Sequence, residues 1–301
     1  YIYIYIKNSI MSSSKIVKAA CVIIGDEVLN GKITDTNSKF FSKYCYELGI
    51  KLTEICIIGD EPEHLISTCK RLAITNDLIV TTGSTGPTPD DIAYDCLCKV
   101  YDDTPLCLSK TCVDRMERFN APTKRLSGQA LKDHYRMATL PSGPNTSEDY
   151  PLATSWVPVA GIHNQIFIFP GIPQLFENLI NNMKDKFKQM FQLKDIKYKR
   201  YYIKTEYGES SMSRILRDLQ NKANKTSPEI KIGSYPHWGL GFNTISVLGF
   251  EEHDDLLKEL RDEVIQKLEG IEISAEEEEK ISEQRVEKET DDGYKVVKDS
   301  A

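Results

Sequence analysis

Residues 81–91, with the sequence TTGSTGPTPDD, combine the residue types that bind a phosphate with two carboxylates that repel one. Glycines and small hydroxyl residues let a backbone turn tightly at the end of a strand and aim successive N–H groups at one point. The helix that follows adds the positive end of its dipole, so the run predicts a phosphate cradle. An ordinary turn between a strand and a helix, with Asp90 as the helix cap, is the alternative that the residues leave open.

Asp90 and Asp91 constrain the chemistry of this cradle, because two carboxylates repel a phosphate unless a cation lies between them. Mg²⁺ takes one or two carboxylates together with the phosphates of a substrate, so the functional interpretation is a bridging metal. Glu27 and Asp60 follow the first two predicted strands. Parallel strands end at the same edge of a sheet, so we expect Glu27, Asp60 and Asp91 to surround a metal or an attacking water. Capping of a local helix explains Asp60 equally well.

The elements that must position these residues alternate between strand-like and helix-like segments. Strands are expected at 19–24, 52–58, 77–81, 156–160 and 166–169, and helices at about 37–48, 62–75 and 90–100. Such alternation predicts an α/β fold, a doubly wound and mainly parallel sheet whose ligand lies beyond the carboxyl ends of the strands. A second pattern of strand, helix, two strands and helix over residues 198–268 predicts a smaller α+β domain.

The predicted domain boundaries follow the density of apolar residues. Residues 1–15 are interpreted as a non-native or disordered N-terminus, because YIYIYIKNSI has low complexity. The α/β domain is expected over residues 16–190 and the α+β domain over 195–270. Residues 271–301, with AEEEEK and alternating Glu and Lys, lack the apolar residues for a core and are predicted to be a disordered acidic tail.

Composition narrows the function classes. A formal net charge of −7 and a pI near 5.4 argue against binding of nucleic acid through bulk electrostatics. No stretch reaches about 18 uninterrupted apolar residues, so no membrane segment is predicted. The eight cysteines lie between Cys21 and Cys112 without a Cys-x-x-Cys pair, which favours reduced thiols packed in a core and a cytoplasmic location.

Several segments together resemble one known family. The run of residues 25–37, GDEVLNGKITDTN, followed by Asp60 and by TTGSTGPTPDD, is similar in order and spacing to the molybdopterin-binding family of MoaB, Mog and the CinA N-terminal domain. FPGIP at 169–173, YGESSMSR at 207–214 and GSYPHW at 233–238 resemble CinA-type proteins and the N-terminal domain of eukaryotic FAD synthases. The resemblance covers about residues 17–270 and implies a site for a small nucleotide or pterin.

The resemblance also implies roles for individual residues. Asp91, Asp60 and Glu27 are expected to be catalytic, and Asp90, Asp91 and Asp60 are expected to hold a divalent Mg²⁺, Mn²⁺ or Co²⁺. The implied activity is metal-dependent hydrolysis of the pyrophosphate in FAD or ADP-ribose. Two alternatives stay open, a molybdopterin-binding or adenylylating protein and a non-catalytic nucleotide-binding protein. The expected ligand-binding residues are Gly25, Asn37, Thr82, Gly83, Ser84, Thr85, Gly86, Pro87, Thr88, Pro170, Gly171 and Pro173.

Two residues depart from the family's pattern. Ser84 stands where the second glycine of TGG is usual, and Ala93 stands where a threonine is usual. A serine with positive φ is strained where glycine is not, so we expect Ser84 to narrow the cradle and to change or abolish activity. The resemblance to families of dimers and trimers, and apolar residues without an obvious partner at 103–160, predict a homo-oligomer, most simply a dimer.

Overall fold

The computed structural model describes residues 16–119, 122–193, 197–284 and 294–295 of the chain. The chain divides into two compact units, residues 1–195 and 196–301. The predicted N-terminal segment 1–15 lies outside the described residues. Among the residues that the structure describes, no helix is both long and apolar enough to cross a membrane.

The first unit is built on a six-stranded sheet in the order β2-β1-β3-β8-β7-β6. The first four of these strands run parallel, whereas β7 and β6 are antiparallel additions at one edge. This is the mainly parallel α/β sheet that the sequence predicts. The strands are β1 (Lys18–Ile24), β2 (Lys51–Ile58), β3 (Leu78–Thr82), β6 (Thr146–Asp149), β7 (Val159–Ile162) and β8 (Ile166–Phe169).

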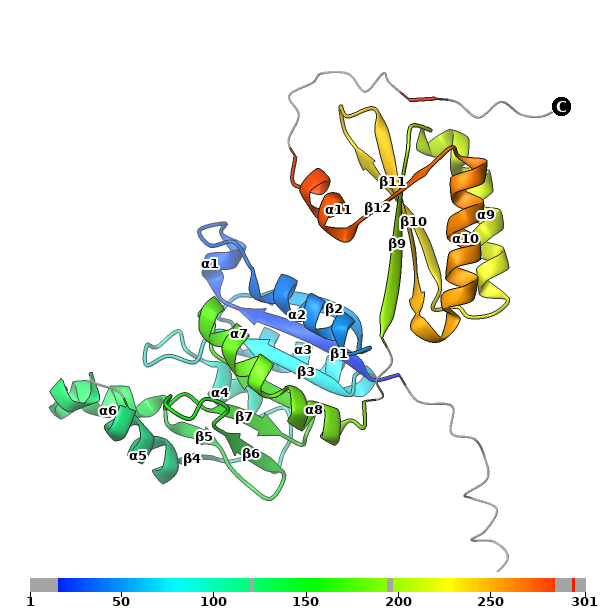
Figure 1. The fold of residues 1–301 in the computed structure, drawn as a ribbon. Helices are drawn as coiled ribbons and strands as arrows, with labels where there is room; N and C mark the ends of the chain where they lie inside the picture. Colours follow the sequence, from blue (N-terminus) through cyan, green and yellow to red (C-terminus); the bar gives the residue numbers. More distant parts are fainter. Residues whose placement is uncertain (1–15, 120–121, 194–196, 285–293, 296–301) are drawn as a thin grey trace, which may run out of the picture. The chain divides into compact units, whose positions relative to one another are not determined.

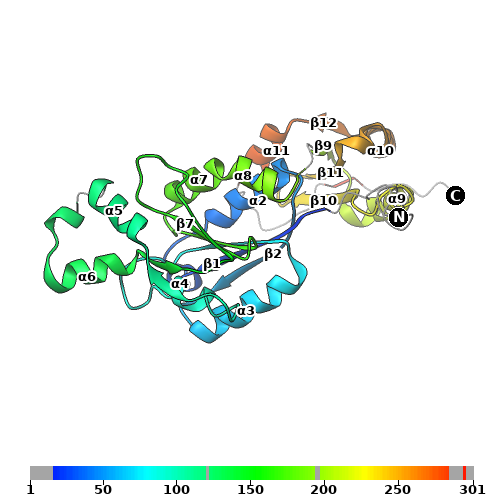
Figure 2. The same cartoon turned by 90° about the horizontal axis from the view of Figure 1, so that it is seen from below.

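Helices cover both faces of this sheet (Figures 1 and 2). One face carries α2 (Asn37–Glu47), α7 (Pro173–Asn182) and α8 (Lys184–Met190), and the other carries α3 (Pro62–Thr75) and α4 (Ala93–Leu97). Each buried strand is apolar at consecutive positions, as a sheet covered on both sides requires.

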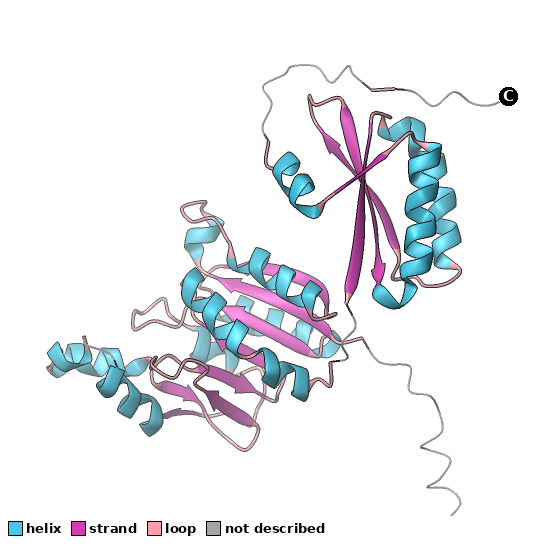
Figure 3. Cartoon of the chain, in the orientation of Figure 1, coloured by secondary structure: helices cyan, strands magenta, loops and turns pink. Residues whose placement is uncertain are grey.

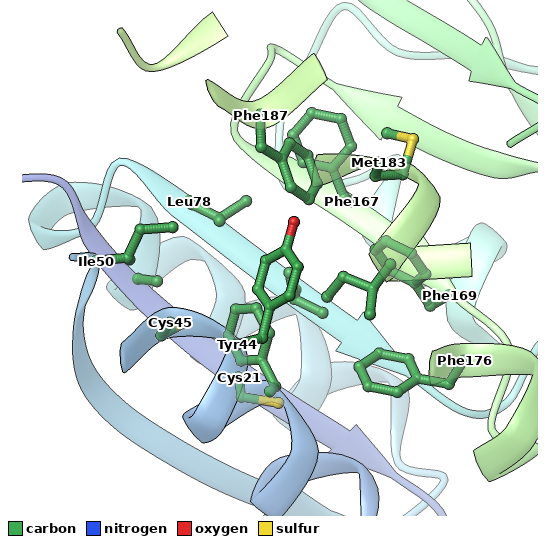
Figure 4. Close-up of a cluster of buried hydrophobic side chains, with 14 of the residues drawn as sticks. Cys21, Tyr44, Cys45, Ile50, Leu78, Phe167, Phe169, Phe176, Met183 and Phe187 are labelled. Atoms are coloured by element: carbon green, nitrogen blue, oxygen red, sulfur yellow. The ribbon is translucent and has the colours of Figure 1, made fainter. Parts of the chain in front are cut away.

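The face under α2, α7 and α8 is rich in aromatic side chains (Figure 4). Phe167 meets Phe187 edge to face with ring centroids 4.9 Å apart, and Phe169 meets Phe176 in the same way at 5.5 Å. Edge-to-face pairs contribute about 0.5–1.5 kcal/mol beyond their burial. They anchor β8, whose carboxyl end leads directly into the FPGIP turn.

Between α4 and β6 the chain forms an insertion with its own small core. It contains β4 (Leu106–Leu108) paired with β5 (Thr139–Pro141). The other short elements of the unit are α1 (Asp26–Leu29), α5 (Lys110–Phe119), a 3-10 turn at Thr123–Arg125 and α6 (Gly128–Arg136). Of these, α5, α6 and the 3-10 turn belong to the insertion. Its buried core consists of Cys112, Met116, Ala138 and Leu140. Residues 120–121 of the insertion lie outside the described ranges.

The second unit has the β-α-β-β-α-β order of a split βαβ fold, with four antiparallel strands in the order β10-β11-β9-β12. Two long helices pack against one face of the sheet (Figure 3). This is the small α+β unit that the sequence predicts. The elements are β9 (Tyr198–Thr205), α9 (Glu209–Asn224), β10 (Lys231–His237), β11 (Phe242–Phe250), a 3-10 turn (Glu251–His253), α10 (Asp254–Lys267) and β12 (Ile271–Ile273).

The prediction of disorder from residue 271 onward is wrong for residues 271–284. β12 pairs with β9, and α11 (Ala275–Ser282) begins with a capping box between Ser274 and Glu277. Glu278 is only 7% exposed, and its carboxylate lies 3.6 Å from Nε2 of the buried His237. A count of apolar residues misses strand pairing, capping and a buried polar contact. Residues 285–293 and 296–301 lie outside the described ranges.

Candidate functional site

A cavity of about 490 Å³ opens at the carboxyl ends of β1 and β3. Most of its walls come from four segments that are distant in sequence: the turn and first residues of α2, the glycine loop after β3, residues 156–158, and the turn that follows β8. Glu27, Val28, Tyr94 and Met137 complete the lining. This is the edge of the sheet where doubly wound folds bind their ligands. Pockets of about 300–1,000 Å³ hold small organic ligands.

Asn37, 6% exposed at the start of α2, holds the cavity together. Its Nδ2 donates to Oγ1 of Thr82 and to the carbonyl of Gly171, both at 2.9 Å. The Thr82 hydroxyl donates to the carbonyl of Pro170 at 2.8 Å, so Thr82 Oγ1 can only accept from Asn37. These partners fix the orientation of the amide.

That orientation leaves Oδ1 of Asn37 as a buried acceptor without a hydrogen bond. Asn37 lines the cavity, and a buried acceptor without a partner is unfavourable by about 1–3 kcal/mol. A ligand hydroxyl or amino group that reached Oδ1 would remove this penalty. A carboxylate or phosphate oxygen would be repelled at the same point.

The glycine loop presents donors beside this acceptor. Gly83 has φ +108°, and a Cβ there would lie 2.1 Å from the carbonyl oxygen of Ile24, so only glycine fits. Ser84 follows with φ +56°. Within the described residues, the N–H groups of Ser84 and Thr85 donate to no protein acceptor. Consecutive N–H groups in such a conformation form a nest that binds anions.

The Ser84 side chain is occupied on the other side of the loop. Its hydroxyl donates to the carbonyl of Asp90 at 2.9 Å and accepts from the N–H of Ile92 at 2.8 Å. Ser84 thus adopts the positive φ expected for it, and two hydrogen bonds offset the strain. The expectation that Asp90 caps the helix is wrong, because α4 begins at Ala93 and no side chain caps it. Ala93 is fully buried in the core under α3 and α4.

Asp91 organises the loop from within. Its Oδ1 accepts from the N–H of Gly86 at 2.6 Å, and its Oδ2 accepts from the N–H of Thr88 at 2.8 Å and from the Thr88 hydroxyl. From the insertion, Arg136 donates to the carbonyl of Thr88 at 2.6 Å and forms an ion pair with Asp95 at 3.0 Å. Asp91 and Arg136 therefore hold the loop in its observed shape.

The structure brings two of the three predicted catalytic carboxylates to the cavity. Glu27 and Asp91 line it, whereas Asp60 does not. The Asp60 carboxylate instead accepts from the N–H of Asp26 at 3.2 Å. Burial raises the pKa of Asp60, the hydrogen bond from the Asp26 backbone opposes this, and the charges of Asp26 and Glu27 add to it.

No group of three or more acidic, histidine or cysteine side chains suited to a metal occurs among the described residues. The Glu27 side chain makes no hydrogen bond or ion pair within those residues. The cavity therefore supplies one unengaged carboxylate, from Glu27, and the partly engaged carboxylate of Asp91. This set fits a cation of the Mg²⁺ type only when a ligand phosphate completes the coordination.

The predicted ligand-binding residues divide into two groups. Gly25, Pro87 and Thr88 lie outside the lining of the cavity. Residues 156–158 do line it, although the sequence predicts a strand there; β7 begins only at Val159. Alternating bulky residues at 156–160 are typical of a strand, and no local signal separates them from a loop. The predicted residues in the lining are Asn37, Thr82, Gly83, Ser84, Thr85, Gly86, Pro170, Gly171 and Pro173, and the lining residues that the sequence did not indicate include Asp35, Tyr94, Met137, Trp156, Val157, Pro158 and Leu175.

All eight cysteines are free thiols, and they do not contribute to the cavity. Six of them are buried, Cys56 is half-buried and Cys107 is exposed. Burial raises the pKa of Cys21 and of Cys45 well above the usual range of a thiol. These side chains act as small apolar residues of the core.

Residues 20–188, which carry the sheet and the whole lining of the cavity, match the family model described as "Probable molybdopterin binding domain". The chain belongs to the molybdopterin binding domain family. Asn37, the glycine loop and the FPGIP turn all lie within this molybdopterin binding domain, and the β-α-β-β-α-β unit follows it.

Relatives of the molybdopterin binding domain include proteins named as FAD synthases and proteins named as CinA-like. A "Probable FAD synthase" of Caenorhabditis elegans is 30% identical over 232 residues, which are 72% of this chain and 43% of that protein. A "CinA-like protein" of Flavobacterium psychrophilum is 33% identical over 168 residues, 55% of this chain and 39% of that protein. The chain thus spans less than half the length of these two curated relatives.

Solved structures similar to the molybdopterin binding domain include CinA of Thermoplasma acidophilum, with 22% identity, a TM-score of 0.48, and 56% of this chain and 98% of that chain covered. MoaB of Thermus thermophilus has 15% identity and a TM-score of 0.39, with 59% of this chain and 95% of that chain covered.

Proposed function

We propose that the chain binds a nucleotide or pterin phosphate in this cavity and hydrolyses the pyrophosphate of a dinucleotide of the FAD or ADP-ribose kind with the help of a divalent cation. The observation that carries the proposal is the pairing of a buried acceptor, Oδ1 of Asn37, with the unengaged N–H groups of Ser84 and Thr85 in one cavity. The acceptor suits a sugar hydroxyl, and the donors suit a phosphate.

Each polar group has a defined task in this scheme. The N–H groups of Ser84 and Thr85 hold non-bridging oxygens of one phosphate, and Asn37 orients the sugar through a hydroxyl. Glu27 and Asp91 would hold the cation, which polarises the phosphoryl oxygens and offsets their charge. The Glu27 carboxylate also takes one proton of the attacking water, whose oxygen bonds to phosphorus as the bond to the bridging oxygen breaks. Two monophosphates leave, one of which takes a proton from solvent.

The test is incubation of the protein with FAD, ADP-ribose and NAD in Mg²⁺, Mn²⁺ or Co²⁺, followed by chromatography of the products. Glu27→Gln should lower turnover by roughly a hundredfold, because it removes both a metal ligand and the proton acceptor. Glu63→Gln is the matched control, since Glu63 is exposed on α3 and outside the cavity. Equal rates for the two variants, or no turnover of any dinucleotide, would contradict the hydrolytic proposal.

A second candidate is binding without turnover. It is favoured by the engagement of both Asp91 oxygens with the loop, which leaves Glu27 as the cavity's unengaged carboxylate among the predicted catalytic residues. Calorimetry separates the two candidates, because a binding protein takes up ADP-ribose but releases no monophosphate. The family's name supports a third candidate, binding or adenylylation of molybdopterin, for which product formation from molybdopterin and ATP is the assay.

A further inference from the structure

We infer that Trp156 forms the platform for a planar ring, so that the cavity selects a phosphate that carries a flat heterocycle. This inference rests on the proposed binding of a nucleotide or pterin and adds the residue that reads the ring. Trp156 is half-buried, lies outside every motif that indicated the site, and lines the same cavity as the glycine loop.

The wall around Trp156 differs in chemistry from the loop. Val157 and Pro158 continue it along the chain, and Tyr94 of α4 and Met137 after α6 join it from other elements. Aromatic rings and a thioether suit the face of a ring rather than a charged group. The N–H groups of the glycine loop suit a negatively charged group instead. The two parts of the cavity together therefore match a ligand with one flat apolar end and one anionic end.

The segment before Trp156 is held in place by a single guanidinium group. Arg115 of α5 donates to the carbonyls of Leu152 at 3.0 Å, Ala153 at 3.1 Å and Ser155 at 2.6 Å. Its guanidinium also lies over the ring of Tyr150, 4.3 Å from the centroid. These contacts fix the loop without the ligand, so little entropy remains to be lost when a ring stacks there.

Trp156 is also supported from behind. It packs against the buried core of the insertion, and its ring centroid lies 6.2 Å from that of His134. Trp156 keeps part of its surface on the cavity wall, which is the arrangement of a preformed stacking platform.

The magnitude of the effect follows from the general strength of ring stacking. Stacking of a base on an aromatic side chain changes affinity by between about 5-fold and about 150-fold. Trp156→Ala should therefore weaken binding of ADP by at least about fivefold and leave binding of inorganic pyrophosphate unchanged. Trp156→Phe retains an aromatic face and should recover most of the affinity for ADP.

The experiment uses the chain's two tryptophans, Trp156 and Trp238. Trp238 is 57% exposed in the second unit, so Trp238→Phe serves both as the matched control and as a background in which Trp156 is the sole tryptophan. Calorimetry gives the affinities for ADP, ribose 5-phosphate and pyrophosphate. Fluorescence excited at the red edge of the indole band reports contact, because adenine neither absorbs there nor accepts energy from tryptophan.

The inference is supported if ADP quenches or shifts Trp156 emission, ribose 5-phosphate does not, and only the ADP affinity falls in Trp156→Ala. It is overturned if Trp156→Ala binds ADP as the unchanged protein does, or if ADP leaves Trp156 emission unaltered. A protein that binds neither ADP nor pyrophosphate overturns the proposed function as well. If Trp156→Ala fails to fold, Trp156→Phe and the fluorescence titration still decide.

Discussion

Asn37→Asp is the change that examines the frame of the cavity most directly. The variant keeps the shape of the side chain but replaces the Nδ2 donor by an oxygen. That oxygen would face Oγ1 of Thr82 and the carbonyl of Gly171, the two acceptors that now lie 2.9 Å from Nδ2. An ionised carboxylate would be repelled by both, so folding should raise the pKa of the new carboxyl group.

The sign and size of the effect follow from that raised pKa. An unperturbed aspartate has a pKa of about 3.9. If the ionised form is too unfavourable in the folded protein, the carboxyl group takes up a proton instead, and this costs about 1.4 kcal/mol of unfolding free energy for each pH unit above 3.9. The largest loss of unfolding free energy that the new carboxyl group can cause through its charge is therefore about 4 kcal/mol at pH 7 and about 1.5 kcal/mol at pH 5. The deficit is absent below the unfolded pKa and grows as the pH rises toward the folded pKa. One lost hydrogen bond adds about 1 kcal/mol at every pH.

Denaturation by guanidinium chloride at pH 5 and pH 7 measures these differences, with Trp156 fluorescence in the Trp238→Phe background reporting on the first unit. Asn178→Asp is the control, because Asn178 is exposed on α7 and should change the free energy of unfolding by less than about 0.5 kcal/mol. The reasoning is refuted if Asn37→Asp lies within about 1 kcal/mol of the unchanged protein at pH 7. A deficit that is the same at both pH values would refute the proposed orientation of the amide.

Four further predictions concern the loop, the C-terminal elements and assembly. Asp91→Asn should lower the free energy of unfolding by about 1–3 kcal/mol and weaken pyrophosphate binding, since one oxygen that accepts from the loop is lost; unchanged binding by calorimetry would contradict this. Ser84→Gly should lower stability by about 1 kcal/mol, because two hydrogen bonds outweigh the relief of positive φ, and a more stable variant would show the reverse. A chain ending at Gly270 should melt more than about 4 °C below one ending at Gln284, because it lacks β12, α11 and the contact between Glu278 and His237; equal melting temperatures would mean that these elements add no stability. Light scattering should give about twice the 34.2 kDa of one chain, and a single-chain mass at micromolar concentration would exclude the dimer.

The sequence predicts most of the sheet because its strands and helices carry strong local patterns. Residues 19–24 and 78–80 are continuous apolar runs that are followed by a glycine or by hydroxyl residues, and β1 and β3 lie there. The helix expected over about residues 37–48 is α2, and the N–H of Ser38 in its first turn donates to Asp35 at 3.0 Å. Periodicity and capping act over a few neighbouring residues, so one chain is enough to read them.

The parts that the sequence did not predict depend on contacts between distant residues. Nothing local shows that α4 would begin without a side-chain cap, with the N–H of Ile92 donating to the Ser84 hydroxyl and Asp90 outside the cap. The place of Trp156 in the cavity depends on Arg115, 41 residues earlier, which holds the carbonyls just before it. The contact of Glu278 with His237 likewise joins two elements of the second unit that are distant in sequence. The charged residues of α11 by themselves therefore predict a solvated tail.

The bonds of Asn37 to Thr82 and Gly171 bridge 45 and 134 residues of sequence. The cavity is consequently one of the last features of the first unit that a growing polypeptide can complete, since α2, β3 and the turn after β8 must all have left the ribosome. Closing such long loops is slow compared with forming local helices. A small-molecule ligand cannot template the early strands during synthesis, but by mass action it would retain molecules that have finished folding.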